Sequence, residues 1–289
     1  MRILTSMFGS HLSISGGMHN AILRAERIGF DTVQVFTKNQ QQWRCKPLDT
    51  AAVDQWCGEC SRLKMKTTVS HDSYLINLAS PDDALRRKSI DLFVEEINRC
   101  AMLKIPLLVT HPGAHMGQGE DVGLRRVAES LDEVHAATPT AKKTVVTCLE
   151  ITAGQGTSLG YKLEHLAQIM AMVKDAKRLG VCLDTAHLFA AGYDIRGRKY
   201  AAFRKSLDAL IGVKHVKVLH LNDSKKALGS RVDRHEHIGR GTIGIEGFKP
   251  FVRDAAFKDV PKILETAKEK DDQGRDWDAV NLEVLRSLL

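Results

Sequence analysis

The sequence contains no long apolar run, and this absence excludes a class of protein. No stretch of about 18 consecutive apolar residues is present, so no transmembrane helix is expected. No apolar region near the N-terminus resembles a signal peptide either. The six cysteines are too scattered along 289 residues to form the disulfide framework of a small secreted protein. We therefore expect an intracellular, cytoplasmic protein with no membrane partner.

Two short motifs lack the context that their usual function needs. Cys57 and Cys60 have the spacing of a thioredoxin redox pair, but they lie inside a predicted helix and not at the start of one. Gly154 and Gly156 follow the fifth predicted strand and not the first, so we interpret them as loop-shaping glycines and not as a dinucleotide site. No low-complexity linker is visible, and we expect residues 1–289 to form one domain.

The composition allows one large core and gives a mildly basic protein. Apolar residues make up 43% of the chain and charged residues 27%, which is ordinary for a globular domain. The formal net charge is +7 at pH 7. This balance suits a polyanionic partner, but many proteins are mildly basic, so the charge alone identifies none.

Six apolar segments along the chain each end in a histidine or an acidic residue. These terminal residues are His71, His111, Glu150, Asp184, His220 and Glu265. The intervals between them are 40, 39, 34, 36 and 45 residues. Each interval has the length of one strand, one helix and their loops, so the polar residue recurs at the same place in a repeating unit.

The whole chain is predicted to alternate strands with helices. Strands are predicted near residues 3–8, 32–36 and 262–265, and in the segments that end at His71, His111, Glu150, Asp184 and His220. Helices are predicted over residues 16–29, 50–63, 81–103 with Pro81 in the first turn, 121–137, 163–179, 199–211, 247–256 and 278–288, with a long loop over 221–244. Eight nearly continuous apolar strands indicate a single α/β (β/α)₈ TIM barrel; an open doubly wound sheet is the rival.

In such a barrel the polar strand ends converge on the C-terminal face of the strands, where active sites lie. His187 follows Asp184 in what we predict to be a loop, and Asp233 and His235 lie in the loop after the seventh strand. Five histidines and four carboxylates gathered there would be costly without a metal. Mixed imidazole and carboxylate ligands favour zinc, with manganese or iron as substitutes. Nine ligands with a bridging carboxylate suit two or three ions.

The charge of such a site favours phosphate chemistry. Three divalent ions bring +6 and four carboxylates bring −4, which leaves +2 to stabilise developing negative charge. Two close metals can share a hydroxide and stabilise both oxygens of a displaced phosphodiester. A lone histidine is usually structural, and we interpret the remaining ones accordingly. His19, His135, His165 and His215 are expected to pack or lie on the surface, whereas His11, His115 and His237 are expected near the active face.

The sequence around these residues is recognisable. The matching segments are residues 36–40, 71–78, 111–113, 150–156, 182–194, 220–225, 229–235 and 264–266. In these segments, which run in order along essentially the whole chain, the protein resembles the endonuclease IV family of zinc-dependent apurinic/apyrimidinic endonucleases (AP endonuclease family 2).

The resemblance implies a site with three zinc ions. By motif, the first ion takes His71, His111 and Glu150; the second takes Glu150, Asp184, His220 and Glu265; the third takes His187, Asp233 and His235. It also implies hydrolysis of the phosphodiester 5′ to an abasic site, leaving a 3′-hydroxyl and a 5′-deoxyribose phosphate. A hydroxide that bridges two metals attacks the phosphorus, Glu150 is the central catalytic ligand, and blocked 3′ ends are trimmed by the same chemistry.

The expected partner is double-stranded DNA that contains abasic sites or blocked 3′ ends. Tyr74 and Leu75 follow the His71 ligand, and an aromatic with an aliphatic side chain can wedge into a base stack. The alternative is a buried loop anchor, since large apolar residues are usually packed. Further DNA contacts are predicted at Lys38, Asn39, Gln41, Gln42, Arg231 and Arg234, although the two arginines suit a solvated surface equally well.

The chain departs from relatives at three positions. Gln41 stands where some members have arginine, Arg240 where an acid is frequent, and Ala267 where many have proline. None is a predicted ligand, so we expect altered DNA contact or loop stability.

Two other functions stay open. Sugar isomerases and epimerases use the same barrel with one or two metals, but they need no DNA wedge. A non-enzymatic DNA-binding module would not need nine aligned ligands. We expect a monomer, because a DNA-binding face must stay open.

Overall fold

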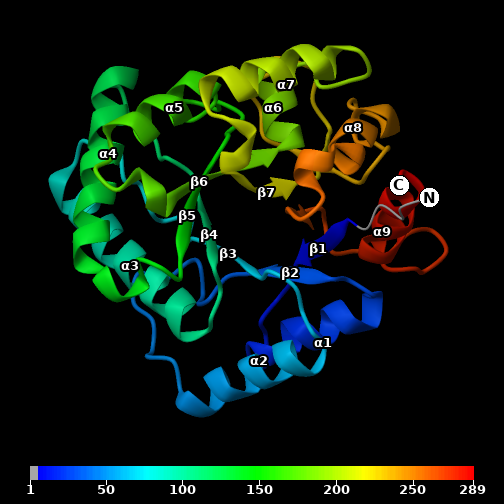
Figure 1. The fold of residues 1–289 in the computed structure, drawn as a ribbon, viewed down its shortest axis with the longest axis horizontal. Coiled ribbons are helices and arrows are strands. Elements are labelled where there is room, and N and C mark those ends of the chain that lie inside the picture. Colours follow the sequence, from blue (N-terminus) through cyan, green and yellow to red (C-terminus); the bar gives the residue numbers. More distant parts are fainter. Residues whose placement is uncertain (1–5) are drawn as a thin grey trace.

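Eight parallel strands form a closed barrel in the computed structural model, which describes residues 6–289 (Figure 1). The strands are β1 (Met7–His11), β2 (Thr32–Val35), β3 (Val69–His71), β4 (Leu107–Thr110), β5 (Val146–Glu150), β6 (Leu179–Asp184), β7 (Val216–His220) and β10 (Pro261–Leu264). Each strand pairs in parallel with its neighbours in chain order, and β1 pairs with β10 to close the ring. The predicted barrel is therefore confirmed, and the open sheet is excluded.

Helices cover the outside of the barrel (Figure 1). They are α1 (His19–Ile28), α2 (Thr50–Arg62), α3 (Asp83–Met102), α4 (Glu120–Ala137), α5 (Leu163–Met172), α6 (Thr185–Ala191), α7 (Lys199–Leu210), α8 (Lys249–Arg253) and α9 (Trp277–Ser287). Local sequence sets several boundaries. The side chains of Asp49 and Asp82 accept backbone N–H groups at the starts of α2 and α3, and Gly29 ends α1 with φ 90°.

The apolar residues separate into two buried clusters. The barrel interior holds a small cluster that includes Val69, Val109, Val218 and Ile263. A larger cluster lies between the strands and the surrounding helices. Because side chains alternate along a strand, β4, β5, β6, β7 and β10 contribute to both clusters, and their sequences are nearly continuous apolar runs.

Several element boundaries differ from those predicted. The first strand begins at Met7, and the first part of the predicted strand, residues 3–5, lies outside the described residues. Pro81 precedes the α3 cap and is not in the first turn, because Asp82 supplies the cap itself. The helix predicted over residues 163–179 ends at Met172, and β6 already begins at Leu179.

The chain around the predicted metal ligands is more regular than expected. His187 lies in α6, which follows β6 directly, and not in a loop, because Asp184 caps this short helix by accepting the His187 N–H at 2.8 Å. The long loop after β7 contains a small antiparallel pair, β8 (Asp223–Ser224) and β9 (His235–Glu236). Regular structure therefore holds His187 and His235 of the third predicted ligand group, while Asp233 lies in the loop just before β9.

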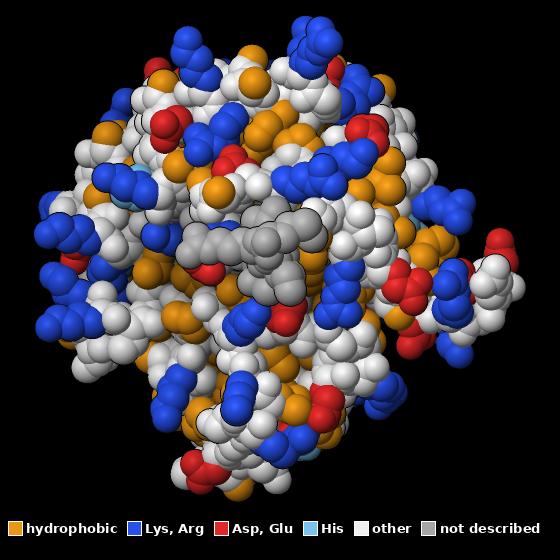
Figure 2. All heavy atoms as spheres, turned by 45° about the vertical axis from the view of Figure 1, so that its right-hand side comes forward, with side chains coloured by type: hydrophobic (Ala, Val, Ile, Leu, Met, Phe, Trp, Pro, Cys, Tyr) orange, Lys and Arg blue, Asp and Glu red, His pale blue; other side chains and the backbone are white. Residues whose placement is uncertain are grey.

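Basic side chains are spread over the surface. On the face in Figure 2, lysines and arginines are scattered, with acidic side chains between them. The net charge of +7 therefore does not single out this face as a binding surface. Among residues 6–289, no helix combines the length and apolar character needed to cross a membrane.

Candidate metal centre

Glu150 lies at the centre of the site, at the C-terminal end of β5 and fully buried. Its Oε2 atom lies 3.1 Å from His71 Nε2 and 3.2 Å from His111 Nε2. These side chains come from the ends of β3, β4 and β5, which are adjacent strands of the barrel. The three ligand atoms lie close enough together to hold one ion. This is the first of the predicted groups.

The other Glu150 oxygen belongs to a second group. Glu150 Oε1 lies 2.9 Å from His220 Nδ1, and the same nitrogen lies 3.1 Å from Glu265 Oε2 and 3.9 Å from Asp184 Oδ2. Glu150, Asp184, His220 and Glu265 form one compact set of possible ligand atoms. Glu150 can therefore bridge two ions, one on each oxygen.

The third group lies toward the outer edge of the centre. The Nε2 atom of His187 lies 3.1 Å from Asp233 Oδ2, and His235 Nε2 lies 3.3 Å from Asp233 Oδ1. His235 Nε2 also lies 3.6 Å from Asp184 Oδ2, so the third group adjoins the second. The compact cluster here is Asp184, His187 and His235, and Asp233 lies beside both histidines. The nine predicted ligands thus lie together in adjoining groups.

Second partners orient the imidazoles. The Nδ1 atoms of His71 and His187 lie 2.9 Å from the backbone carbonyls of Asp72 and Ile151, respectively. His220 Nε2 lies 2.9 Å from Gln34 Oε1. A hydrogen bond to one nitrogen of each ring therefore directs the other nitrogen toward the carboxylates. Histidines that bind metals are commonly oriented in this way.

Two buried amides connect carboxylates of the second group. Gln34 donates to Glu265 Oε1 at 2.6 Å, and Asn222 donates to Asp184 Oδ2 at 2.6 Å. Asn222 also accepts the backbone N–H of Glu265 at 2.7 Å. Our reading of the sequence did not single out either amide. A glutamine inside an otherwise apolar strand was the available signal for Gln34.

The charges of the centre depend on one another. Burial raises the pKa of Glu150, but the imidazoles of His220 and His111 outweigh burial and hold it well below the ordinary value. Burial lowers the pKa of His220 and of His187, but the neighbouring thiol and carboxylates outweigh it and raise both well above the ordinary value. For Asp233, burial is outweighed by the hydrogen bond to His187, which leaves its pKa at about 2. Glu150 and Asp233 are therefore ionised, with positive charge placed close beside them.

The residues present fit zinc. Imidazole nitrogens and carboxylate oxygens are the ligand types that zinc takes in catalytic sites. His235 Nε2 is buried and has no hydrogen-bond partner, although it faces Asp233 and Asp184. A bound cation would satisfy this nitrogen, since buried polar atoms are rarely left without a partner.

Most of the predicted DNA-contacting side chains lie at the surface near this centre. Tyr74 is 68% exposed, and its ring meets Phe36 edge-on at 5.6 Å between centroids. Leu75 is half-buried. The predicted contacts that are exposed are Asn39, Gln41, Gln42, Arg231 and Arg234.

Lys38 differs from these residues. Its side chain is only 2% exposed, and its ammonium group donates to the carbonyls of Asn39 and Gln42 at 3.0 and 2.6 Å. The physical reason is that the loop curls around the ammonium group and uses it to satisfy carbonyls that would otherwise lack partners. The structure therefore places this predicted contact inside the loop and away from the surface.

In the part of the chain that the structure describes, the other histidines are not among the ligand groups. His11 lies 3.6 Å from Glu265 Oε1 and beside Gln34, close to the centre. His237 stacks on Trp277 at 4.0 Å, and His115 lies in the loop after β4. His135 and His165 are buried in helices. The Cys57–Cys60 pair lies within α2, and burial raises the pKa of Cys60 to about 12, opposite to a redox-active thiol.

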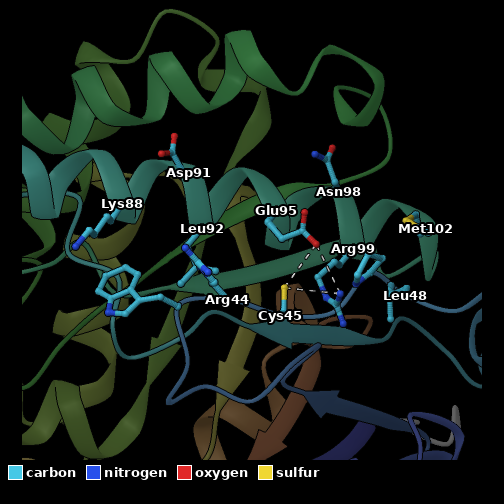
Figure 3. Close-up of a pocket in the computed structure, with 12 residues that line it drawn as sticks. Arg44, Cys45, Leu48, Lys88, Asp91, Leu92, Glu95, Asn98, Arg99 and Met102 are labelled. Atoms are coloured by element: carbon cyan, nitrogen blue, oxygen red, sulfur yellow. Dashed lines mark hydrogen bonds and ion pairs between the residues drawn. The ribbon is translucent and has the colours of Figure 1, made fainter.

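Two cavities lie near the metal centre and the loops that are predicted to contact DNA. One, of about 450 Å³, opens beside the metal centre and is lined by Tyr74, His111, His187, Asp233 and Arg234 among others. A larger cavity of about 850 Å³ lies between residues 43–48 and α3, away from the nine ligands (Figure 3). Size alone therefore does not locate the chemistry.

Comparison with known proteins identifies the family. The family described as "Xylose isomerase-like TIM barrel" matches residues 22–288. The chain is 50% identical over 283 residues to "Probable endonuclease 4" of Chloroflexus aurantiacus, covering 98% of each chain. The crystal structure of endonuclease IV from Thermus thermophilus is similar with a TM-score of 0.85 and 34% identity, again over 98% of each chain.

Sugar epimerases share the fold at much lower identity. A D-tagatose 3-epimerase-like protein is similar with a TM-score of 0.71, but only 20% of residues are identical over 98% of this chain and 96% of that one. This likeness shows the barrel alone, because one barrel hosts many activities. With whole-length identity of 50% to a probable endonuclease 4 and 34% to a solved endonuclease IV, the chain belongs to the endonuclease IV family of apurinic/apyrimidinic endonucleases.

Proposed function

We propose that this protein is a DNA repair endonuclease that hydrolyses the phosphodiester 5′ to an abasic site. The products are a 3′-hydroxyl and a 5′-deoxyribose phosphate, and blocked 3′ ends are trimmed in the same way. The observation that carries the proposal is the arrangement of ligand atoms in three adjoining clusters, with Glu150 shared between two of them and Asp233 beside the histidines of the third. The family relationship supports the DNA substrate.

The nine residues would bind three zinc ions, for which manganese or iron can substitute. His71, His111 and Glu150 would hold the first, Glu150, Asp184, His220 and Glu265 the second, and His187, Asp233 and His235 the third. When bound, these ions supply a nucleophile derived from water at neutral pH and stabilise negative charge on the phosphate. We assign Glu150 as the catalytic carboxylate because its two oxygens face the first and the second group, so it would hold both of these ions.

The chain's own residues orient this arrangement. Gln34 and Asn222 hold Glu265 and Asp184, two carboxylates of the second group, in fixed positions. The buried surroundings of Glu150 and Asp184 exclude bulk water and strengthen their electrostatic interactions. The site is thereby preorganised for charge that develops on a phosphate.

Recognition of the lesion falls to the exposed loops. Because Tyr74 is 68% exposed, the wedge is favoured over the buried anchor. With Leu75 it would fill the gap that a flipped abasic nucleotide leaves in the stack. Arg231 and Arg234 would contact phosphates, and Asn39, Gln41 and Gln42 would contact the backbone or groove.

The departures from relatives all lie on the surface. Gln41 is exposed and brings an amide where some relatives have a cation, so we propose weaker binding of abasic DNA. Arg240 lies 5.5 Å over the Trp277 ring, which gives this cation an internal partner. Ala267 is exposed. None of the three contacts a ligand group, so the chemistry is retained.

Sugar isomerisation or epimerisation is the alternative. The third group argues against it, because a barrel that isomerises sugars with one or two metals has no use for His187, Asp233 and His235 placed together. The exposed ring of Tyr74 beside the cavity is likewise unexplained by a small sugar. We propose that the protein acts on duplex DNA as a monomeric, single-domain barrel.

The test is incubation of the zinc-loaded protein with a labelled duplex that carries one tetrahydrofuran abasic analogue. This analogue resists β-elimination, so a cut requires hydrolysis. Incision 5′ to the analogue, with a 3′-hydroxyl that a polymerase extends, supports the proposal. An uncut duplex, together with epimerisation of a ketohexose by the same preparation, would establish the alternative. The intact duplex and protein stripped of metal are the controls.

A further inference from the structure

The ammonium group of Lys38 is enclosed by its own loop. It donates to two carbonyls, those of Asn39 and Gln42, and so closes residues 38–42 into a tight ring. On its other side, it lies 3.9 Å from Glu96 Oε1 of α3, and both side chains are almost completely buried. A buried cation held in this way is committed to internal partners, since moving it to the surface would leave the carbonyls of Asn39 and Gln42 without this donor.

Glu96 and Ser73 extend this contact to the segment that carries Tyr74. Glu96 Oε1 accepts the backbone N–H of Ser73 at 3.2 Å. Ser73 Oγ donates to the Gln40 carbonyl at 2.6 Å and accepts the Leu75 N–H at 3.3 Å. The loop of residues 37–44 and the turn of residues 73–75 are thus joined by one buried hydrogen-bond network.

The outer side of the first loop has its own contacts: Cys45 Sγ lies 3.7 Å from Glu95 Oε1, and Arg99 donates to the Lys46 carbonyl at 3.0 Å. There the 850 Å³ cavity separates residues 43–48 from part of α3, and Cys45, Glu95 and Arg99 line it (Figure 3). Arg99 contributes from its buried position by donating to the Thr37 carbonyl at 3.2 Å. The contacts that join this loop to the Tyr74 turn therefore lie at its inner side, at Lys38 and Ser73, whereas its outer contacts reach only α3.

We propose that Lys38, together with Glu96 and Ser73, is a positioning residue that locks the loop of residues 37–44 to the Tyr74 turn, and that it makes no phosphate contact itself. The two segments would then meet damaged DNA as one preformed surface, which lowers the ordering cost of binding. This inference rests on the proposed function, since it concerns how that site recognises an abasic duplex.

The discriminating variant is Lys38→Met, which keeps the length of the side chain and removes the charge. A lost phosphate contact lowers the slope of log affinity against log salt by about one. A lost positioning contact leaves that slope unchanged and lowers the preference for abasic over intact duplex, by at least about fivefold. Arg234→Gln, at an exposed cation, is the positive control for the slope. Lys205→Met, on the exposed side of α7, should change neither quantity.

Ser73→Ala is a second variant that leaves both Lys38 and Glu96 in place. It removes the hydroxyl that joins Gln40 to Leu75, so the same loss of preference is expected, with zinc content retained. In each variant, backbone hydrogen exchange should accelerate in the loop of residues 37–44 and in the turn of residues 73–75. The segment without the substitution should therefore also exchange faster. If Lys38→Met does not fold, Ser73→Ala and its exchange pattern still decide the matter.

The outcomes separate this inference from the proposed function. A reduced salt slope in Lys38→Met, or full preference for abasic duplex in Ser73→Ala, would overturn the positioning role. If the unaltered protein shows no preference for abasic duplex, the proposed function fails, and the exchange experiment still reports whether the two loops are locked together.

Discussion

Replacing Tyr74 by alanine removes the most exposed aromatic ring beside the metal centre. The ring is 68% exposed, meets Phe36 edge-on at a centroid distance of 5.6 Å, and lies tilted to His71 at 6.0 Å. Its loss should change folding stability by no more than about 0.5 kcal/mol, as is usual at exposed positions. Stacking on a base contributes about 1–3 kcal/mol, so affinity for an abasic duplex should fall about 5- to 150-fold.

Fluorescence anisotropy with a labelled tetrahydrofuran duplex would measure this loss, with an intact duplex of the same sequence as reference. The penalty should appear for the abasic duplex, because only there does a gap accept the ring. Tyr74→Phe keeps the ring and should retain most of the affinity. Unchanged affinity in Tyr74→Ala, or an equal loss for both duplexes, would refute the wedge.

Three further predictions concern metal loading, salt and the buried lysine of the barrel. In Glu150→Gln, elemental analysis should show loss of the two ions that share this carboxylate, while the third ion remains. Incision should be abolished, and part of the DNA affinity should be kept. Wild-type turnover would contradict the mechanism. Affinity for DNA should fall steeply as salt rises because phosphate contacts release counterions, whereas salt-independent binding would indicate a small-molecule substrate. Burial lowers the pKa of Lys262 from 10.5 to about 8, so the unfolded chain binds more protons between these values and stability rises with pH there. Denaturant titrations would measure the free energy of unfolding of Lys262→Met minus that of the unaltered protein. This difference should fall by about 3 kcal/mol between pH 8 and pH 10.5. A constant difference would show that the pKa of Lys262 is not lowered in the folded protein.

The strand-end pattern predicted the barrel and the gathering of the ligands, for a physical reason. Parallel strands of a barrel all end at one face, so a polar residue repeated at strand ends must converge there. His71, Glu150, Asp184 and His220 all end the strands that were predicted. The spacing alone did not show how they group, and the family resemblance supplied that assignment.

Contacts between distant segments could not be read from the sequence. Lys38 lies among amides and aromatics in a surface loop, a context that suggests a DNA contact, yet its ammonium group is enclosed by its own loop and by Glu96 of a distant helix. The role of Gln34 likewise depends on His220 and Glu265, which are 186 and 231 residues away. Sequence patterns identify such residues as polar but do not identify their partners.

Helix α6 shows a third limit. Only seven residues long, it is too short to give a helical pattern of apolar residues. Its start is instead set by the Asp184 carboxylate, which was already assigned as a ligand. Asp184 thus both caps a helix and faces the metal centre. The sequence motif indicated only its role as a ligand.

The central claim is that nine residues form one centre for three zinc ions that cleaves damaged DNA. Anomalous diffraction at the zinc edge, on crystals of the protein bound to a tetrahydrofuran duplex, tests it most directly. Our account predicts three peaks, one in each ligand group, two of them on either side of the Glu150 carboxylate, with the lesion's 5′ phosphate next to them. A single peak, or a phosphate bound away from the nine ligands, would contradict it.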